Sequence, residues 1–346
     1  MKHLFFLVLP LLLICSASAQ TTYTLQILGN PGASAGPSAI NDNGDVAGVS
    51  NFGTGPSQAV LWPHSGGTID VGAGTRHSAA TALNNSDQVV GYFWDKIRML
   101  HAFLWTASGG FQDLGTLGGC CSAAYGISDN GEVVGSAYTS SNAIGAFTWT
   151  SAAGMKTLST GIGFYKDITA TAVNANGYVV GYGVVTSTGK TRGLFWTPTG
   201  VIRDIGDLTG GTSWTWAYGI NATNDVVGMT LASDGDYLAF QLQNPFLGNT
   251  MQSLGLLGSY TVYSAYAINN SGEIVGSANC PSCGNSHAFV YTASGGLQDL
   301  NTLVTNNSAG WILTSAVSVN SSGQIAVQVF NSSGTARAAV LTPSAQ

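Results

Sequence analysis

Short apolar segments alternate with turns rich in glycine, asparagine and serine along most of the chain. The apolar segments are rich in β-branched, aromatic and aliphatic residues, which is typical of β-strands. No segment sustains the 3.6-residue period of an amphipathic helix. The pattern therefore predicts an all-β protein with almost no helix.

This pattern repeats seven times, each time as an apolar residue followed by a turn that begins with Asn or Ser and then by a Val-Val-Gly-like segment. The marker pairs are Ile40-Asn41, Leu83-Asn84, Ile127-Ser128, Val173-Asn174, Ile220-Asn221, Ile268-Asn269 and Val319-Asn320, spaced 43, 44, 46, 47, 48 and 51 residues apart. A period in the forties is typical of four-stranded propeller blades. We predict a seven-bladed β-propeller with four antiparallel strands in each blade.

The second repeat shows the predicted blade most clearly, with strands expected at residues 79–84, 88–92, 101–106 and 111–114. Two of its positions recur in every repeat. The position of Ala102 is always small: Ala59, Ala146, Gly193, Ala239, Ala288 and Ala338. The position of Trp105 is always large: Trp62, Trp149, Trp196, Leu242, Tyr291 and Leu341. Large groups facing small ones would interlock neighbouring blades.

The last repeat contains only three predicted strands, at residues 316–320, 324–329 and 337–342. Residues 23–29, which precede the first repeat, match the missing fourth strand. Pairing of this segment with residues 337–342 would close the ring and remove an open sheet edge. A linear β-solenoid is the alternative, and it would leave the N-terminal strand without a partner.

The segment His101-Ala102-Phe103 is followed by Gly109-Gly110 and by Asp113-Leu114-Gly115-Thr116-Leu117-Gly118-Gly119, and the triplet returns as His287-Ala288-Phe289. In these features the chain resembles the bacterial HAF-repeat family, whose members are expected to be extracellular. The resemblance implies export and a repeat architecture, and it implies no catalytic residues. Five repeats replace the His, with Gln58, Gly145, Arg192, Leu238 and Arg337.

Residues 1–19 are typical of a cleaved signal peptide, because a short basic start leads into an apolar run and Ala17-Ser18-Ala19 gives a small-x-small cleavage site. We therefore predict export to the periplasm or the exterior, with residues 20–346 forming one propeller domain. No later segment is long and apolar enough to be predicted to span a membrane. The net charge of −6 is scattered, and without a basic stripe nucleic acid is not an expected partner. The chain is expected to be monomeric.

Most of the length variation falls in the predicted loops between second and third strands, at residues 49–57, 93–100, 137–144, 183–191, 230–237 and 278–286. Function usually resides in variable loops on a rigid scaffold. Aromatic residues fall in these loops or just before the first strands, and they are our candidate ligand-binding residues: Trp94, Phe164, Tyr165, Trp214, Trp216, Tyr260, Tyr263 and Trp311. The alternative is that they plug the channel or pack between blades.

The acids on this face that lie outside the repeat pattern are Asp95, Asp167, Asp207, Asp234 and Asp236. A glycosidase needs two carboxylates at a defined separation, and none of these five comes from an inner strand. We predict no catalytic residue, no cofactor and no metal site, because the histidines lack metal-ligand spacing. Four cysteines remain after the leader, and in an exported protein two local bridges are expected, Cys120–Cys121 and Cys280–Cys283. Thioredoxin-like use of Cys280 is the alternative.

The favoured hypothesis is a non-enzymatic binding or scaffold protein that recognises an extracellular glycan or a protein through its variable loops. Whether the chain is an enzyme is left open. A secreted carbohydrate-active hydrolase or lyase that uses loop acids is the first alternative, and a structural surface protein is the second.

Overall fold

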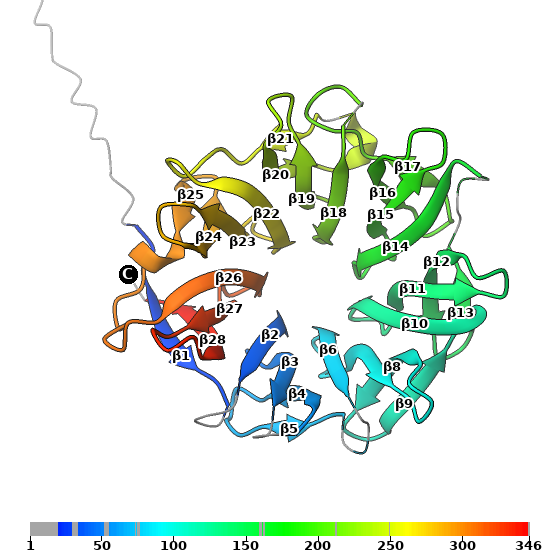
Figure 1. Ribbon diagram of the computed structural model, residues 1–346, viewed down its shortest axis with the longest axis horizontal. Coiled ribbons are helices and arrows are strands. Elements are labelled where there is room, and N and C mark those ends of the chain that lie inside the picture. The colour runs from blue at the N-terminus through cyan, green and yellow to red at the C-terminus, as the bar shows by residue number, and fades with distance from the viewer. Residues whose placement is uncertain are drawn as a thin grey trace, which may run out of the picture.

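The computed structural model describes residues 20–344, apart from residues 30–33, 52–54, 73, 75–76, 159–160, 162, 212 and 249. Seven four-stranded antiparallel sheets surround a central axis and form a closed ring (Figure 1). This is the predicted seven-bladed β-propeller. The predicted signal peptide, residues 1–19, lies outside the described residues.

Each blade runs from an innermost strand at the central opening to an outer strand at the rim (Figure 1). The innermost strands are β2 (Ala35–Ile40), β6 (Ser78–Leu83), β10 (Gly118–Ile127), β14 (Tyr165–Val173), β18 (Thr215–Ile220), β22 (Thr261–Ile268) and β26 (Ile312–Val319). The second strands are β3 (Val46–Asn51), β7 (Val89–Trp94), β11 (Val133–Thr139), β15 (Val179–Val185), β19 (Val226–Leu231), β23 (Ile274–Cys280) and β27 (Ile325–Phe330).

The two remaining strands of each blade lie toward the rim. The third strands are β4 (Ser57–Trp62), β8 (Leu100–Thr106), β12 (Ile144–Thr150), β16 (Thr191–Trp196), β20 (Tyr237–Leu242), β24 (Asn285–Thr292) and β28 (Ala336–Pro343). The outer strands are β5 (Ile69–Asp70), β9 (Gly110–Gly115), β13 (Gly154–Thr157), β17 (Ile202–Asp204), β21 (Gln252–Ser253), β25 (Gly296–Asp299) and β1 (Tyr23–Ile27). The described helices are two single 3₁₀ turns, η1 (Pro245–Leu247) and η2 (Leu300–Thr302), and neither is long enough to cross a bilayer.

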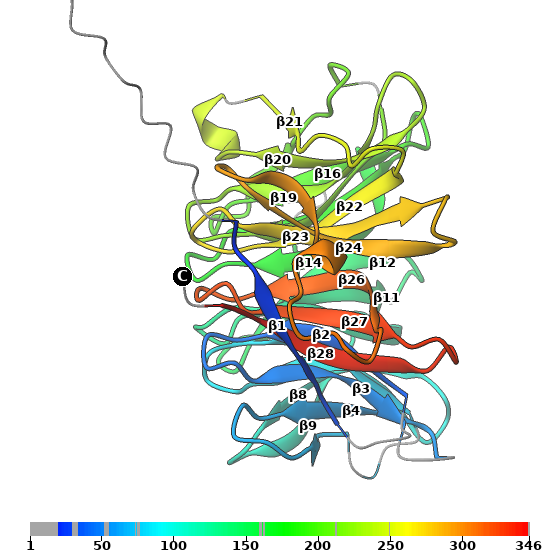
Figure 2. The same cartoon turned by 90° about the vertical axis from the view of Figure 1, so that its left-hand side faces the viewer.

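The last blade is closed by the N-terminal strand, as predicted (Figures 1 and 2). Strand β1 pairs antiparallel with β28, with Leu25 opposite Leu341 and Ile27 opposite Ala339. Tyr23 is buried, and its hydroxyl donates a hydrogen bond to Oε1 of Glu273 in the sixth blade, at 3.1 Å. The seam between the chain ends is therefore packed like a strand pair inside any other blade.

The core fills the spaces between neighbouring blades. In the first such space, Ala59 and Leu61 of one blade pack with Ala80 and Phe103 of the next. The six alanines at the small position are at most 1% exposed, and Trp62 and Trp196 at the large position are at most 2% exposed. The predicted pairing of small and large positions between blades is therefore confirmed.

The glycine of the Val-Val-Gly-like segment is present in six of the seven blades, where the innermost strand approaches it closely. A Cβ atom added to Gly91 would lie 1.9 Å from the carbonyl oxygen of Ala79, and one added to Gly228 would lie 2.0 Å from that of Trp216. Each innermost strand contains a β-bulge near this point, for example between Ala217 and Gly219 of β18. A bulge bends its strand. In the last blade Val327 stands at the glycine position.

The asparagines of the marker pairs form a ring of buried side chains that joins the blades. Their Nδ2 groups donate to the backbone oxygen at the same position of the next blade: Asn41 to Asn84, Asn84 to Ser128, Asn174 to Asn221, Asn221 to Asn269, Asn269 to Asn320 and Asn320 to Asn41, at 2.9–3.3 Å. Each Oδ1 accepts backbone N–H groups of its own turn, as Asn221 does from Thr223 and Asp225. The hairpin turn predicted from these asparagines is thus also a contact between blades.

Candidate functional site

The antiparallel order of each blade places the loops between second and third strands on the same side as the links between blades. We call this side the loop face, and the opposite side, which carries the hairpin turns at the marker pairs, the turn face. The loops are shorter than predicted because the strands extend into them. In the second blade, only residues 95–99 remain outside β7 and β8. The Asp95 side chain accepts the N–H groups of Ile97 and Met99 and so tightens this turn.

An apolar cavity of about 330 Å³ lies on the loop face between the first two blades. Trp94, at the end of β7, is 43% exposed, and its ring lies 5.8 Å from that of His77. The cavity is lined by Val49, Ser57, His77, Ser78, Ala79, Tyr92 and Trp94, so the described lining holds no Asp, Glu, Lys or Arg. Of the predicted aromatic residues, Trp94 lines this cavity, and the sequence analysis missed its neighbours His77 and Tyr92.

A second aromatic group lies on the loop-face side of the fifth blade. The rings of Trp214 and Trp216 are stacked, with centroids 5.9 Å apart and an interplanar angle of 18°. Tyr237 of β20 lies 5.9 Å from Trp216 at a tilted angle. The structure therefore brings together two predicted residues and one that the sequence analysis did not single out.

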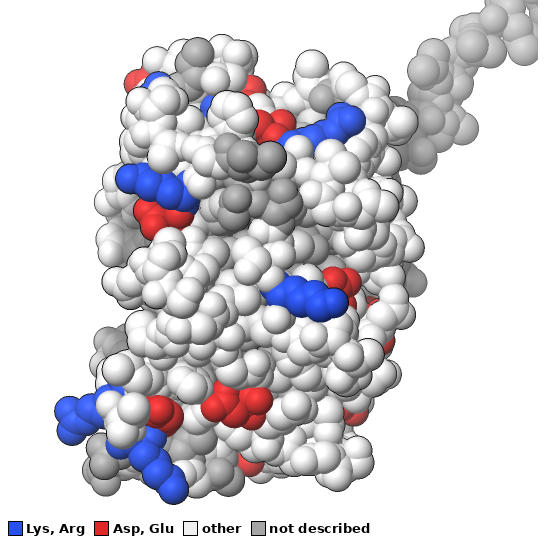
Figure 3. Space-filling model, turned by 90° about the vertical axis from the view of Figure 1, so that its right-hand side faces the viewer, with Lys and Arg blue, Asp and Glu red and all other residues white. Residues whose placement is uncertain are grey.

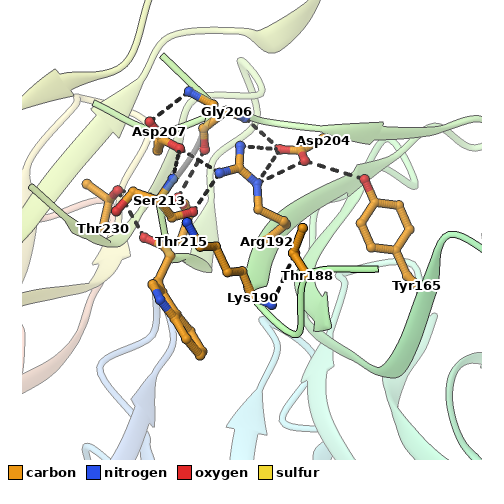
Figure 4. A network of polar contacts seen from close by, with 12 residues as sticks. Tyr165, Thr188, Lys190, Arg192, Asp204, Gly206, Asp207, Ser213, Thr215 and Thr230 are labelled. Atoms are coloured by element: carbon orange, nitrogen blue, oxygen red, sulfur yellow. Dashed lines mark hydrogen bonds and ion pairs between the residues drawn. The ribbon is translucent and has the colours of Figure 1, made fainter. Parts of the chain in front are cut away.

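Arg192 of β16 anchors the link that leads to these tryptophans (Figure 4). It is 5% exposed and pairs with both oxygens of Asp204, and its Nη1 lies 2.5 Å from Oδ2 of Asp207. The same nitrogen donates to the backbone oxygen of Ser213, at 2.6 Å, and Thr215 donates to that of Gly206. The start of β18 is thus fixed by ion pairs and hydrogen bonds.

Among the predicted loop acids, Asp207 has the clearest structural role. Burial by itself would raise the pKa of Asp207, but the backbone N–H groups of Gly211 and Ser213, together with Arg192, hold this pKa well below its usual range. Its side chain is fully buried. Asp207 thus holds the link in shape as an ionised group.

The other predicted aromatic residues divide into exposed and packed groups. Phe164 is 70% exposed. The hydroxyl of half-buried Tyr165 lies 3.4 Å from Oδ2 of Asp204, and Trp311 packs against the core of the last blade. Tyr263 is fully buried, and its hydroxyl accepts a hydrogen bond from the N–H of Leu257. The prediction that Tyr263 is available to a ligand therefore needs correction.

Tyr260 belongs to a partly buried polar cluster in the sixth blade. Nδ1 of His287 lies 2.7 Å from Oδ2 of Asp299, and the Tyr260 hydroxyl donates to the same oxygen at 2.9 Å. Burial and this carboxylate raise the pKa of Tyr260 to about 12. The same third-strand and outer-strand positions pair in the second blade, as His101 and Asp113 at 2.8 Å, and in the fourth, as Arg192 and Asp204. The recurring His thus pairs with an acid of its own blade.

The four cysteines form one bridge. Cys280 and Cys283 are joined by a disulfide, as predicted, whereas Cys120 and Cys121 are free thiols with sulfur atoms 2.7 Å apart. The expected Cys120–Cys121 bridge is therefore absent from the structure. Cys280, Cys283 and His287 place one ligand atom each within 4.8 Å of one another, a grouping that their spacing did not suggest. The disulfide already uses both sulfur atoms.

The central channel contains two chambers separated by an aliphatic ring. Seven bulge residues face the chamber on the loop-face side, which has a volume of about 240 Å³: Ser38, Thr81, Tyr125, Thr171, Tyr218, Tyr266 and Val317. The ring consists of Ile40, Leu83, Ile127, Val173, Ile220, Ile268 and Val319. Beyond it lies the turn-face chamber, lined by the asparagine ring. The residues that face the loop-face chamber could have been found in the sequence, because each stands two positions before the apolar residue of a marker pair.

Charged side chains are sparse and scattered on the face shown in Figure 3. The fold and these sites define a seven-bladed β-propeller whose candidate binding surfaces are aromatic and uncharged. No family model and no curated protein matches the chain. Among solved structures, the chain is similar to an oligogalacturonate lyase from Vibrio parahaemolyticus, with a TM-score of 0.63 and 9% identity over 93% of this chain and 96% of that one. A putative TolB from Agrobacterium tumefaciens has a TM-score of 0.47 and 13% identity over 68% and 89%. At this identity the first likeness shows the fold alone.

Proposed function

We propose that this protein is a non-enzymatic binding protein that recognises a neutral extracellular glycan through its loop face. The observation that carries the proposal is the cavity between the first two blades, where Trp94 and Tyr92 line an apolar space without Asp, Glu, Lys or Arg among its described residues. Aromatic faces pack against the CH faces of sugar rings while hydroxyl groups remain free to form hydrogen bonds. A charged glycan would need cationic or anionic partners that this lining lacks.

Two of the acids that could serve an enzyme already have structural roles. Asp95 caps the 95–99 turn, and Asp207 is paired with Arg192. Asp234 and Asp236 are exposed on the loop face, in the turn between β19 and β20. Because these two acids are exposed, a carbohydrate-active hydrolase or lyase is the alternative function. The experiment must therefore distinguish binding without turnover from catalysis.

The test is a glycan array with residues 20–346, followed by assays of sugar release. We expect binding to neutral glycans without turnover, weakened about tenfold or more in Trp94→Ala, as for a hot-spot aromatic residue. Phe164→Ala, which removes an exposed aromatic ring outside the cavity, is the matched control. Equal binding by wild type and Trp94→Ala would contradict the proposal. Sugar release that is lost in Asp234→Asn would identify the enzyme instead.

Export is part of the same proposal, together with membership of the HAF-repeat family. A Cys280–Cys283 disulfide is consistent with an oxidising compartment. Mass spectrometry of the protein from its native host should find an N-terminus at Gln20. An intact Met1, or a lipid on Cys15, would contradict it.

A further inference from the structure

The chamber on the loop-face side of the channel is built for an uncharged polyhydroxy ligand. Hydroxyl-bearing side chains line it from all seven blades, and none of the described lining residues is charged. Its walls therefore offer hydrogen bonds and its aliphatic floor offers apolar contact, the two surfaces that a pyranose ring presents. At about 30 Å³ for each water, 240 Å³ equals roughly eight waters, which is enough room for one sugar ring.

Tyr218 offers a hydroxyl group that is free to bind such a ligand. Thr81 and Thr171 donate to the backbone oxygens of Ala124 and Ala217, and the Tyr266 hydroxyl lies 3.0 Å from Oγ of Ser277. The Tyr218 hydroxyl has no protein partner within the part of the chain that the structure describes, and its ring lies 6.0 Å from that of Tyr266. Burial raises the pKa of Tyr218 above its ordinary value, so its hydroxyl stays protonated well above neutral pH.

Two tryptophans near the start of β18 precede the chamber residue Tyr218. Trp216 and Tyr218 are both partly exposed in β18, and Trp214 stacks on Trp216 from the preceding link. The Arg192 network fixes this link through Ser213.

The floor of the chamber decides how a glycan could use it. The aliphatic ring separates the two chambers, and the asparagine ring joins all seven blades beyond it except for the link from the third to the fourth. A sugar that enters from the loop face therefore meets this apolar ring at the inner end of the chamber. The arrangement suits the end of a chain and not its middle.

We propose that the loop-face chamber binds one terminal residue of a neutral glycan, with the following residues stacked on Trp216 and Trp214. This inference rests on the proposed function, because it names which part of the glycan is bound and where. It adds a site in the channel to the cavity beside Trp94.

The experiment is isothermal titration calorimetry of residues 20–346 with maltohexaose, cellohexaose and mannohexaose. The cyclic hexasaccharide α-cyclodextrin, which has no chain end, is compared with maltohexaose. Ser38→Tyr blocks the chamber: the Ser38 hydroxyl makes no hydrogen bond within the described residues, and three other blades already carry Tyr at this bulge position. Tyr218→Phe removes the Tyr218 hydroxyl and keeps the aromatic ring. Tyr291→Phe, which removes a hydroxyl from a residue packed in the core of the sixth blade, is the matched control.

We expect at least one linear hexasaccharide to bind, with affinity lowered tenfold or more by Ser38→Tyr and about threefold to tenfold by Tyr218→Phe. Tyr291→Phe should bind as wild type does, and α-cyclodextrin should bind at least tenfold more weakly than maltohexaose if maltohexaose is bound. Wild-type affinity in both channel variants, with binding weakened by Trp94→Ala, would overturn this inference and leave the proposed function standing. No binding of any neutral glycan, here or on the array, would overturn both. If the melting temperature shows that Ser38→Tyr does not fold, the affinity of Tyr218→Phe tests the inference instead.

Discussion

At the scale of single residues, each buried asparagine of the ring serves two blades. Asn221 accepts two N–H groups of its own turn through Oδ1 and donates to the next blade through Nδ2. In the third blade Ser128 keeps part of this role, because its hydroxyl accepts the N–H of Glu132 at 3.2 Å. A hydroxyl is too short to make the second contact as well.

Asn221→Ala should therefore lower the free energy of unfolding by about 2–3 kcal/mol, because it leaves buried N–H and C=O groups unpaired. Asn221→Ser should cost less, since the serine can take the role that Ser128 has. Ser128→Asn should raise stability by about 0.5–1 kcal/mol, because it supplies the missing link to the fourth blade. Urea unfolding of the three variants measures the order, and an alanine variant as stable as wild type would show that the ring contributes nothing.

The environment of Asp207 predicts that the free energy of unfolding depends on pH. Its folded-state pKa lies below the unfolded value of about 3.9. Its charge therefore stabilises the fold at neutral pH, and this contribution is lost as the pH falls below about 4 toward the folded-state pKa. Asp207→Asn, which breaks the buried pair with Arg192, should cost about 3 kcal/mol at pH 7.

The difference in unfolding free energy between wild type and Asp207→Asn should then shrink between pH 5 and about pH 2. Denaturant unfolding of both proteins across this range gives the measurement. A difference that stays constant down to pH 2 would mean that the carboxylate is not held ionised by its partners.

At the scale of elements, the bulged innermost strand and the glycine-bearing second strand form one unit. The bulge aims one residue of every blade into the channel, and the glycine beside it lets the bent strand approach. The channel lining and the Val-Val-Gly pattern thus have a common cause. A substitution at the glycine should affect the site as well as the fold.

Gly228→Ala should destabilise the protein by about 3 kcal/mol or more, because its Cβ would overlap the carbonyl oxygen of Trp216. Gly145→Ala is the control, because the nearest atom to its added Cβ is 3.6 Å away. Thermal unfolding compares the two variants. Near-equal melting temperatures would show that β18 shifts at no cost.

At the scale of the whole molecule, the ring depends on a seam between the two ends of the chain. The N–H of Ser344 donates to the oxygen of Thr22, at 2.8 Å, so the two ends of the described chain are neighbours. Strand β1 covers the edge of β28, which would otherwise expose unpaired backbone and the apolar side chains of the last blade.

Deletion of residues 21–30 should therefore abolish soluble folding. Moving residues 20–29 to a position after residue 344, through a short Gly-Asn turn, should restore folding, because β1 would then follow β28 as an ordinary hairpin. Size-exclusion chromatography and melting temperature measure both proteins. A soluble deletion product with unchanged melting temperature would contradict the seam.

The fold could be predicted from the sequence because its determinants are periodic. The marker pairs set the number of blades, and the match of residues 23–29 to the missing strand set the closure. The candidate site was less accessible, because it depends on bulges and on packing between blades. A register shift between Thr261 and Tyr263 accompanies the turn of Tyr263 into the core, and Trp94 meets His77 across two strands. A contact between strands is not visible in the local residue pattern, and the bulge residues become apparent only when the repeats are aligned on their marker pairs.

The pairing of β1 with β28 also sets the order in which the protein can finish folding. Strand β1, the first described strand of the chain, has its partner more than 300 residues later. It must stay unpaired until the last strand arrives, and contacts of such long range form slowly. The other blades are built from consecutive strands and can assemble before then. The final step is thus the capture of one end of the chain by the other, and any chaperone that assists this protein should act on the waiting N-terminal strand.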